Sequence, residues 1–255
     1  MKKTLFAATL AAAVSGALAA DVTLYGVADV GLRYTNTKTD GVSTDKLEMM
    51  SGHNAGSRFG LKGSEDLGNG WKAGFLLEGQ YLVDTGALKN AKFFHRQATV
   101  SISGPLGTVY AGRMGTVYAG RMGTLSSAAG SADLIFAAGD AFDGGDNLIY
   151  ALSVESRRDN TLLYVTPAAG GLQGYLQYSF QGSGQENVQS SLNERYMGAG
   201  LRWKAGAFES ALAVEHVRYA AAADDVKGAL DDKLAVSLSA NYDFGVTKLF
   251  GTALW

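Results

Sequence analysis

Apolar and polar residues alternate over long stretches of this chain. In DVTLYGVADVGLRY, every second position of residues 22–34 is apolar or glycine, whereas the positions between them include Asp29 and Arg33. The same alternation recurs in GWKAGFLLEGQY, LQGYLQYSFQ, YMGAGLRWK and DKLAVSLSANYDF. Successive side chains of a β-strand point to opposite faces of its sheet, so the pattern predicts an all-β chain. The low count of 2 prolines agrees, because proline cannot donate a hydrogen bond to a β-ladder.

The apolar faces of these predicted strands have the features of surfaces that meet lipid. The strands run to ten or more residues, whereas soluble strands usually have about five or six, and a tilted strand needs about ten to cross a bilayer. Their opposite faces carry charged and amide side chains, which a watery lumen can solvate but a protein core cannot bury without partners. Aromatic residues stand near the ends of the apolar faces, where the girdles of membrane barrels lie: Tyr34, Trp71, Tyr81, Phe180, Trp203 and Phe244.

The connections between the predicted strands alternate in length. DLGNG, SGPLG, PAAGG, KAGA and DFG are short, whereas the stretches around residues 35–55, 82–92, 115–153, 182–193 and 219–231 are long and polar. Short periplasmic turns and long outer loops are the plan of an outer-membrane barrel. The sequence therefore predicts a transmembrane antiparallel β-barrel.

The first twenty residues have the three-part form of a secretory signal peptide. Lys2 and Lys3 are followed by an apolar run and then by small residues, with cleavage expected after Ala19 or Ala20. The alternative is an N-terminal membrane anchor, but the apolar run is too short to span a bilayer. We therefore expect residues 1–20 to be a cleaved signal peptide, so that the chain is exported. The absence of cysteine suits an oxidising compartment in which no disulfide is needed.

Several longer segments resemble a known family. DVTLYG after the signal, SRFGLKGSEDLGNGWKAGFLLEGQ, FFHRQATVSISGPLGTVYAGR and RRDNTLLYVTP are similar to the general diffusion porins of Gram-negative outer membranes. The resemblance implies a sixteen-stranded porin barrel that assembles as a homotrimer among outer-membrane lipid and lipopolysaccharide. It implies a water-filled channel for passive diffusion of ions and small hydrophilic solutes. It also implies that the third outer loop folds into the lumen, where its carboxylates face arginines on the wall.

The resemblance assigns basic residues to the wall of the constriction. Arg58 and Lys62 of SRFGLKG would face water while Phe59 and Leu61, which lie between them, face lipid. The second wall arginine is the arginine of the first or of the second copy of the repeated GTVYAGRM. The alternative is that each basic residue is an ordinary lumen or rim residue. The remaining assignments are Arg113 or Arg121 for the second position, Arg157 for the third with Arg158 as its register alternative, and Arg33 as an additional candidate.

The resemblance places the opposing carboxylates in a constriction loop at about residues 115–153. This stretch contains GTLSSAAGSADLIFAAGDAFDGGDN, and its FDGGD resembles the glycine-rich loop tip of the family. The expected carboxylates are Asp140, Asp143 and Asp146, followed by Asp133. The alternative is a solvated loop surface. Opposed charges across a narrow aqueous passage select among permeating ions, and arginine keeps its charge across physiological pH.

The number of predicted strands differs from that of the family. About eleven strands follow residue 20, the last within VTKLFGTALW, whereas antiparallel bacterial barrels close with even counts. At about twenty-one residues per strand and connection, sixteen strands need roughly 340 residues. We therefore expect residues 21–255 to be an incomplete porin β-barrel domain that lacks strands at its C-terminal end.

Residues 107–122, GTVYAGRMGTVYAGRM, contain the same eight residues twice. Because eight is even, such an insertion leaves every later strand residue on its original face. A solenoid would need several copies, so we interpret the pair as a local sequence duplication rather than a functional motif. The duplication predicts either an overlong fifth strand or additional backbone in the third loop.

Catalytic and metal-binding interpretations find little support in the sequence. His53, His95 and His216 are dispersed, without zinc-ligand spacing or cysteine partners, and SGHNAGS does not make a catalytic triad. The formal net charge of -2 gives no basis for a nucleic-acid partner. We expect no enzyme activity and no cofactor. The alternatives that stay open are a non-conducting outer-membrane adhesin or structural barrel, an outer-membrane hydrolase barrel, and a soluble exported β-sandwich.

Overall fold

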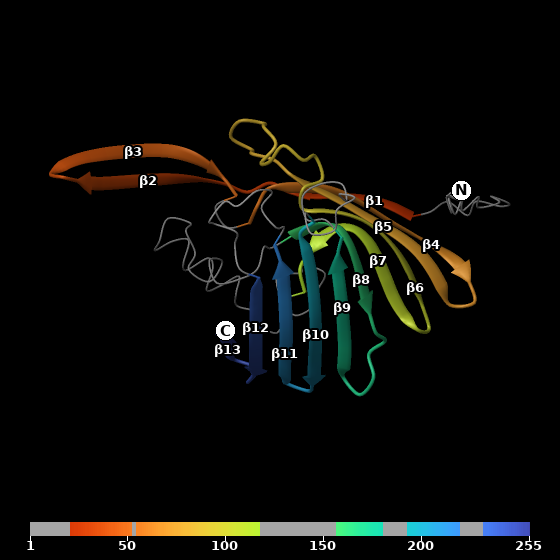
Figure 1. Ribbon diagram of the computed structural model, residues 1–255. Helices are drawn as coiled ribbons and strands as arrows, with labels where there is room; N and C mark the ends of the chain where they lie inside the picture. Colours follow the sequence, from red (N-terminus) through yellow and green to blue (C-terminus); the bar gives the residue numbers. More distant parts are fainter. Residues whose placement is uncertain (1–20, 53–54, 118–156, 181–192, 220–231) are drawn as a thin grey trace.

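A computed structural model describes residues 21–52, 55–117, 157–180, 193–219 and 232–255. Eleven strands in this part of the chain form one antiparallel sheet in the order β1-β4-β5-β6-β7-β8-β9-β10-β11-β12-β13, and β2 and β3 form a separate two-stranded sheet (Figure 1). The strands are β1 (Asp21–Val27), β2 (Val30–Thr39), β3 (Val42–Ser51), β4 (Arg58–Gly68), β5 (Trp71–Gln80), β6 (Gln97–Gly104), β7 (Gly107–Gly115), β8 (Arg157–Val165), β9 (Leu172–Ser179), β10 (Arg195–Ala205), β11 (Phe208–Arg218), β12 (Lys233–Asp243) and β13 (Lys248–Leu254).

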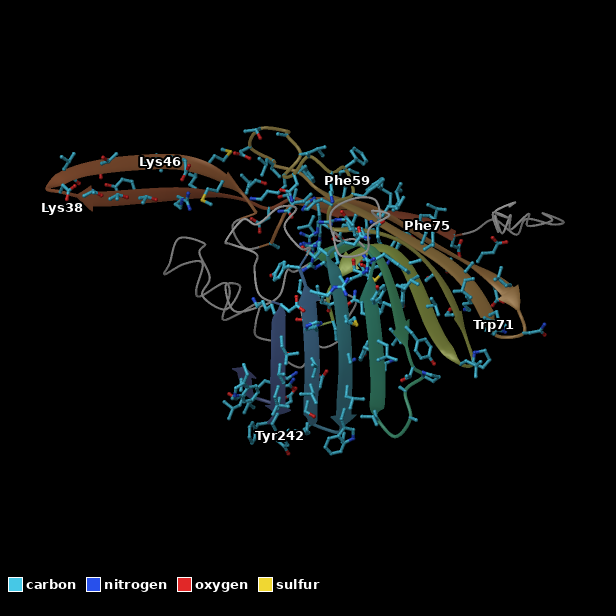
Figure 2. All side chains as sticks on the ribbon, in the orientation of Figure 1. Lys38, Lys46, Phe59, Trp71, Phe75 and Tyr242 are labelled. Atoms are coloured by element: carbon cyan, nitrogen blue, oxygen red, sulfur yellow. The ribbon has the colours of Figure 1, made fainter. Side chains whose placement is uncertain are left out.

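The main sheet has an apolar outer face and a mostly polar inner face, as the alternation predicts. The register pairs apolar residues with apolar residues across neighbouring strands. Phe75 of β5, for example, lies opposite Val100 of β6 on the outer face. The outer side chains are exposed, with Leu24 at 72% and Leu176 at 60%. Trp71 and Tyr242 stand at the short-turn ends of their strands (Figure 2). The all-β fold and the predicted division of faces are confirmed.

Short turns and long connections lie at opposite ends of the main sheet. The short turns join β4 to β5, β6 to β7, β8 to β9, β10 to β11 and β12 to β13 (Figure 1). We call the other end the long-connection end. No helix among the described residues is long and apolar enough to cross a membrane.

The predicted loop at residues 35–55 is largely wrong, because β2 and β3 form a hairpin there. Its two central residues, Asp40 and Gly41, have φ values of 51° and 83°. A type I′ turn requires positive φ at both positions, and an Asp-Gly pair suits it. The Asp-Gly pair in KTDGVST therefore indicates a hairpin. The long polar stretch around it favoured the interpretation as a loop instead. The hairpin extends away from the main sheet (Figure 1).

The eleven predicted strands correspond to the eleven strands of the main sheet. The first predicted strand, however, is divided into β1 and β2 at Ala28 and Asp29. Asp29 is held by local hydrogen bonds instead of the ladder: its N–H donates to Ser57 Oγ at 2.9 Å, and its carbonyl accepts from the Gly52 N–H at 2.8 Å. These bonds end the pairing of β1 with β4 and allow the chain to continue into the hairpin.

The two identical octapeptides differ in structure. Residues 107–114 all lie in β7, which pairs with β6 in a register that the tight β6–β7 turn sets. β7 ends at Gly115, so Thr116 and Val117 of the second copy have left the strand. The Val117 N–H donates to Tyr196 Oη of β10 at 3.0 Å. From Thr116 onward, the described part of the second copy therefore adds backbone to the third connection, while its first residue, Gly115, ends β7.

A small apolar cluster covers part of the inner face where the chain leaves β7. It joins Val117 to side chains of β7, β8, β9 and β11. Its buried members are Met114, Val117, Leu163, Tyr175, Ala211 and Ala213. The third connection thus begins by turning toward the inner face. Residues 1–20 lie outside the described residues, so the signal peptide stays a prediction.

Candidate functional site

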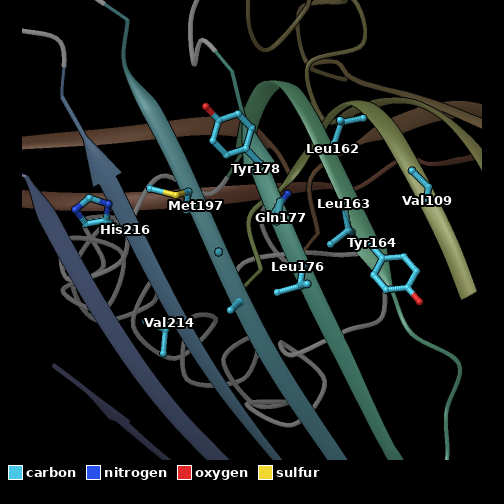
Figure 3. Close-up of a pocket in the computed structure, with 12 residues that line it drawn as sticks. Val109, Leu162, Leu163, Tyr164, Leu176, Gln177, Tyr178, Met197, Val214 and His216 are labelled. Atoms are coloured by element: carbon cyan, nitrogen blue, oxygen red, sulfur yellow. The ribbon is translucent and has the colours of Figure 1, made fainter. Parts of the chain in front are cut away.

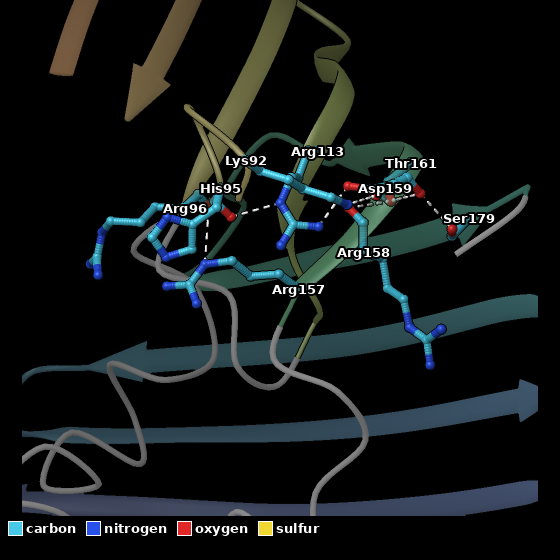
Figure 4. Close-up of polar contacts among 9 residues, drawn as sticks. All are labelled: Lys92, His95, Arg96, Arg113, Arg157, Arg158, Asp159, Thr161 and Ser179. Carbon is cyan, nitrogen blue, oxygen red and sulfur yellow. Dashed lines mark hydrogen bonds and ion pairs between the residues drawn. The ribbon is translucent and has the colours of Figure 1, made fainter. Parts of the chain in front are cut away.

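Four arginines meet at the long-connection end of the sheet. Arg58 begins β4, Arg96 directly precedes β6, Arg113 lies near the end of β7 and Arg157 begins β8. In an antiparallel sheet, the starts of alternate strands and the ends of those between them lie at the same edge. Figure 4 shows Arg113 and Arg157 reaching the backbone of His95 and Arg96, while the Arg96 side chain extends to the other side. We call these four arginines the arginine cluster.

The carboxylate of Glu78 binds two members of the arginine cluster. Arg96 Nε lies 2.5 Å from Glu78 Oε1, and Arg58 Nε lies 3.7 Å from Glu78 Oε2. The Tyr25 hydroxyl donates to Glu78 Oε2 at 2.8 Å, and Arg96 Nη1 donates to Gln80 Oε1 at 2.8 Å. The Arg96 side chain is only 4% exposed. Glu78 therefore compensates a buried guanidinium and orients a more exposed one.

The carboxylate of Asp159 binds a second pair of cations. Arg113 Nη1 donates to Asp159 Oδ1 at 2.6 Å, and Lys92 forms an ion pair with Asp159 Oδ2. Arg113 Nε donates to the His95 carbonyl at 2.6 Å (Figure 4). Arg113 is therefore held at both of these guanidinium nitrogens.

Arg157 connects the groups around the two carboxylates. Its Nε donates to the Arg96 carbonyl at 3.0 Å (Figure 4). Arg96 binds Glu78, and the carbonyl of the neighbouring His95 binds Arg113. The backbone of His95 and Arg96 therefore links the residues around Glu78 to those around Asp159. The arginine cluster is thus a continuous polar network along one edge of the sheet.

A β-bulge aims Arg113 into this network. Strict alternation would place Arg113 with Val109 on the outer, lipid-facing side of β7. The β7–β8 register shifts between Gly112 and Met114, and Gly112 has a φ of 130°. At this shift two residues of β8, Asp159 and Asn160, lie opposite Arg113, so the extra residue of the bulge is in β8. A Cβ on Gly112 would lie 2.1 Å from the Ala98 carbonyl oxygen, so the backbone at this position requires glycine. Bulges commonly re-aim side chains in this way.

The remaining wall candidates of β4 and β8 lie apart from the carboxylates of the arginine cluster. Arg158 is 2% exposed, forms an ion pair with Glu194 and has its guanidinium 5.6 Å from the Tyr196 ring centroid. Lys62 is exposed, with its ammonium 5.7 Å from the ring centroid of Tyr25. Between the two register alternatives, Arg157 is therefore the one that joins the arginine cluster.

Arg33 is not part of the arginine cluster. It lies in the β2–β3 hairpin, where its Nη2 is 2.5 Å from Glu48 Oε1. The other predicted constriction residues lie outside the described residues: Arg121, Asp133, Asp140, Asp143 and Asp146.

Sequence reasoning missed Arg96, Glu78 and Asp159. Alternation places Glu78 on the water-facing side of its strand, near the long-connection end. These two features of the sequence were the available signal that Glu78 belongs to the site. Arg96 shares the parity of the outward residues Ala98 and Val100, but β6 starts only at the next residue, so strand alternation does not govern it. Only the fold shows that both carboxylates receive arginines from neighbouring strands.

His95 is buried beside the arginine cluster in the β5–β6 connection. Burial, followed by the positive charges of Arg157, Arg96, Arg113 and Lys89, lowers the pKa of His95 from 6.5 to about 4. Its Nδ1 is buried and makes no hydrogen bond within the described part of the chain. The imidazole is therefore neutral at physiological pH, and the charge of the site comes from its arginines.

The free energy of unfolding is expected to decrease as the pH falls from about 6.5 to about 4. In this range the unfolded chain binds a proton at His95 that the folded protein excludes, so acid favours unfolding. The decrease is at most about 3 kcal/mol, for a pKa shift of about 2.5. Urea unfolding at several pH values measures it. His95→Gln should flatten the pH dependence. Identical curves for the native chain and His95→Gln would contradict the assignment.

The described residues contain no group of three or more His, Cys, Asp or Glu side chains that could hold a metal ion. His53 lies outside them, and His216 lies 3.7 Å from Asp232 at the far side of the sheet. The chemistry of the arginine cluster is electrostatic: fixed cations next to an aqueous space attract anions.

The chain matches a family model described as Gram-negative porin over residues 7–253. Outer membrane porin protein 32 of Delftia acidovorans is 33% identical over 258 residues, which cover 98% of this chain and 68% of that protein. An outer membrane porin protein of Bordetella pertussis is 32% identical over 274 residues, which cover 98% of this chain and 68% of that protein. Among solved structures, the anion-selective porin from Comamonas acidovorans has a TM-score of 0.66 at 30% identity, covering 92% of this chain and 68% of that one.

These matches agree with the all-β sheet, its lipid-type outer face and its polar inner face. The chain therefore belongs to the Gram-negative porin family, as an outer-membrane protein that forms a water-filled channel for passive diffusion.

Proposed function

We propose that this porin prefers anions and that the arginine cluster lines its constriction. The observation that carries the proposal is the charge balance of the site. Among the described residues of the network, the four arginines and Lys92 surround two carboxylates, Glu78 and Asp159. Rings of charge select among permeating ions, and a guanidinium cannot be deprotonated in proteins. A positive wall would therefore persist over the whole physiological pH range.

The similarity to an anion-selective porin supports this proposal. The sequence of that porin is 30% identical to this chain, and the structural match extends over 92% of this chain. We further propose that Asp133, Asp140, Asp143 and Asp146 of the third connection face the arginine cluster and narrow the passage. Assembly as a homotrimer, contact with outer-membrane lipid and lipopolysaccharide, and passage of small hydrophilic solutes are parts of the same proposal. We assign the protein no catalytic activity.

Zero-current potentials in a planar bilayer test the proposal directly. With a tenfold KCl gradient, we expect an anion-to-cation permeability ratio of about five. One unit charge at about 4 Å in water contributes about 1 kcal/mol, which corresponds to roughly that ratio. The preference should decrease at high salt, because ions screen the fixed charge. A ratio below one would contradict the anion preference. Absence of any conductance would favour the alternative of a non-conducting adhesin or structural barrel.

A further inference from the structure

A polar hollow lies on the inner face of β1, β4, β5, β6 and β7, between the arginine cluster and the short-turn end. It has a volume of about 610 Å³, within the range of small-molecule sites, and all five strands contribute to its lining. The register arranges the inward positions here in two rows across the sheet. One row contains Asp21, Ser64, Gly74, Ser101 and Tyr110, and the next contains Thr23, Lys62, Leu76 and Thr99.

Gly74 leaves space in the middle of the first row. A Cβ at Gly74 would lie 3.0 Å from Ser101 Oγ, so the Ser101 hydroxyl leans over the position where a side chain is missing. The neighbouring Ser64 is also small, whereas Lys62 and Tyr110 are large. The depth of the hollow therefore follows from small residues at the centre of the row and larger residues around them.

Four hydroxyl groups of the lining make no hydrogen bond to another protein group within the described ranges. They belong to Thr23, Ser64, Ser101 and Tyr110. Thr99 differs, because it accepts a hydrogen bond from Gln97 Nε2 at 3.1 Å. Each hydroxyl can donate one hydrogen bond and accept two, and a solute with matching groups can replace the water that such hydroxyls bind. The wall is therefore suited to a solute that itself carries several hydroxyl groups.

The side-chain charges of the lining cancel. Asp21 and Lys62 are its charged residues, and within the part of the chain that the structure describes neither belongs to an ion pair. The Lys62 ammonium lies 5.7 Å from the ring centroid of Tyr25. A carboxylate accepts hydrogen bonds from hydroxyl groups and an ammonium donates to hydroxyl oxygens, so the two residues can bind a neutral polyol together. The arginine cluster differs, because its positive charge exceeds its negative charge.

Leu76 and the ring of Tyr110 add apolar surface to the hydroxyl-lined wall. The C–H face of a cyclic polyol can pack against such side chains while its hydroxyl groups bond to the wall. The hollow of about 690 Å³ on the outer face of β7 to β11 has a different lining (Figure 3). It is lined by Leu162, Leu176 and Val214 among others, and it belongs to the lipid-facing surface. A hydrophilic solute therefore matches the inner hollow.

We propose that the inner hollow is a binding site for a neutral cyclic polyol of monosaccharide size. The hydroxyl groups of Ser101 and Tyr110 bond to the polyol on one side, and Asp21 and Lys62 bond to it on the other. The polyol is thereby held on the channel wall, on the short-turn side of the arginine cluster. The proposal rests on the proposed passage of small hydrophilic solutes along the inner face, and not on anion preference.

Saturation-transfer NMR of the folded full chain, in a detergent without a sugar headgroup, tests this site. We expect D-glucose to receive saturation from the protein and myo-inositol to displace it, whereas cyclohexanol, a ring with a single hydroxyl group, should not. Glucuronate should displace glucose no better than myo-inositol does, because the lining carries no net side-chain charge.

The double variant Ser101→Ala/Tyr110→Phe removes two of the hydroxyl groups. It should weaken glucose binding at least about fivefold, because each neutral hydrogen bond contributes roughly a factor of two to ten. The control Ser103→Ala removes a hydroxyl group from the same strand and the same face, one row nearer the short turn. It should leave glucose binding unchanged.

Equal affinity of the native chain and the double variant for glucose would overturn the proposal, as would an equal loss in Ser103→Ala. Displacement of glucose by cyclohexanol as readily as by myo-inositol, or by glucuronate at a much lower concentration, would overturn the assignment to a neutral polyol. If the double variant does not fold, Ser101→Ala alone is compared with Ser103→Ala. The measurement uses no ion gradient and no conductance, so its failure is distinguishable from a failure of anion preference or of channel formation.

Discussion

Replacing Arg58 and Arg157 by glutamine is expected to shift the zero-current potential of the channel toward that of a cation-preferring pore. Each substitution removes one fixed positive charge from the arginine cluster while the carboxylates of Glu78 and Asp159 stay in place. A unit charge at about 4 Å in water contributes about 1 kcal/mol, so removing two charges should lower the anion-to-cation permeability ratio roughly thirtyfold. Zero-current potentials in a KCl gradient give this ratio directly.

The matched control for this prediction is Arg33→Gln. Arg33 is also an arginine paired with a glutamate, but it lies in the β2–β3 hairpin, apart from the arginine cluster. Its substitution should leave the zero-current potential within experimental error of the native value. The assignment of the constriction fails if the control and the double variant shift the potential equally, or if neither does.

The second large effect is expected for Glu78→Gln, which removes the carboxylate between Arg58 and Arg96. Arg96 is 4% exposed, so its guanidinium would stay buried without its main anionic partner. Removing one partner of a buried ion pair typically lowers the free energy of unfolding by about 3–5 kcal/mol. We expect about 3 kcal/mol for Glu78→Gln, because Arg96 keeps its hydrogen bond to Gln80. Urea unfolding followed by the fluorescence of the 3 tryptophans measures the change.

Glu48→Gln provides the control for stability. Glu48 also binds two cations, Arg33 and Lys46, but in a hairpin whose side chains are more exposed. Exposed ion pairs contribute about 0–1 kcal/mol, so this variant should unfold close to the native urea midpoint. A loss of stability for Glu48→Gln as large as that for Glu78→Gln would contradict the buried role of Glu78.

The arginine cluster shows where residue-by-residue prediction from the sequence stops. The parity of SRFGLKG places Arg58 on the water-facing side, and the structure agrees. The same rule would send Arg113 and Arg96 to the lipid-facing side. It fails at Arg113 because the β7–β8 ladder is irregular there, with two residues of β8 opposite Arg113, and at Arg96 because β6 begins one residue later. Alternation is a property of regular strands, so it carries no information at their irregular ends.

The duplicated octapeptide shows the same dependence on context. Residues 107–114 form a strand because the tight β6–β7 turn pairs them with β6. In the next copy, Gly115 is the last residue of β7, whereas Thr116 and Val117 lie outside the strand. There Val117 packs against the inner face and bonds to Tyr196. Local propensity is the same in both copies, so only long-range pairing separates them.

The sequence by itself determined the class of structure, the two faces of each strand, the number of strands in the main sheet and the end at which the long connections lie. These features follow from side-chain alternation and turn chemistry, which act over a few neighbouring residues. The tertiary structure alone decided that Arg58, Arg96, Arg113 and Arg157 share one network with two carboxylates. Such contacts join residues from separate strands, and they depend on strand register and bulges, which local sequence patterns do not specify.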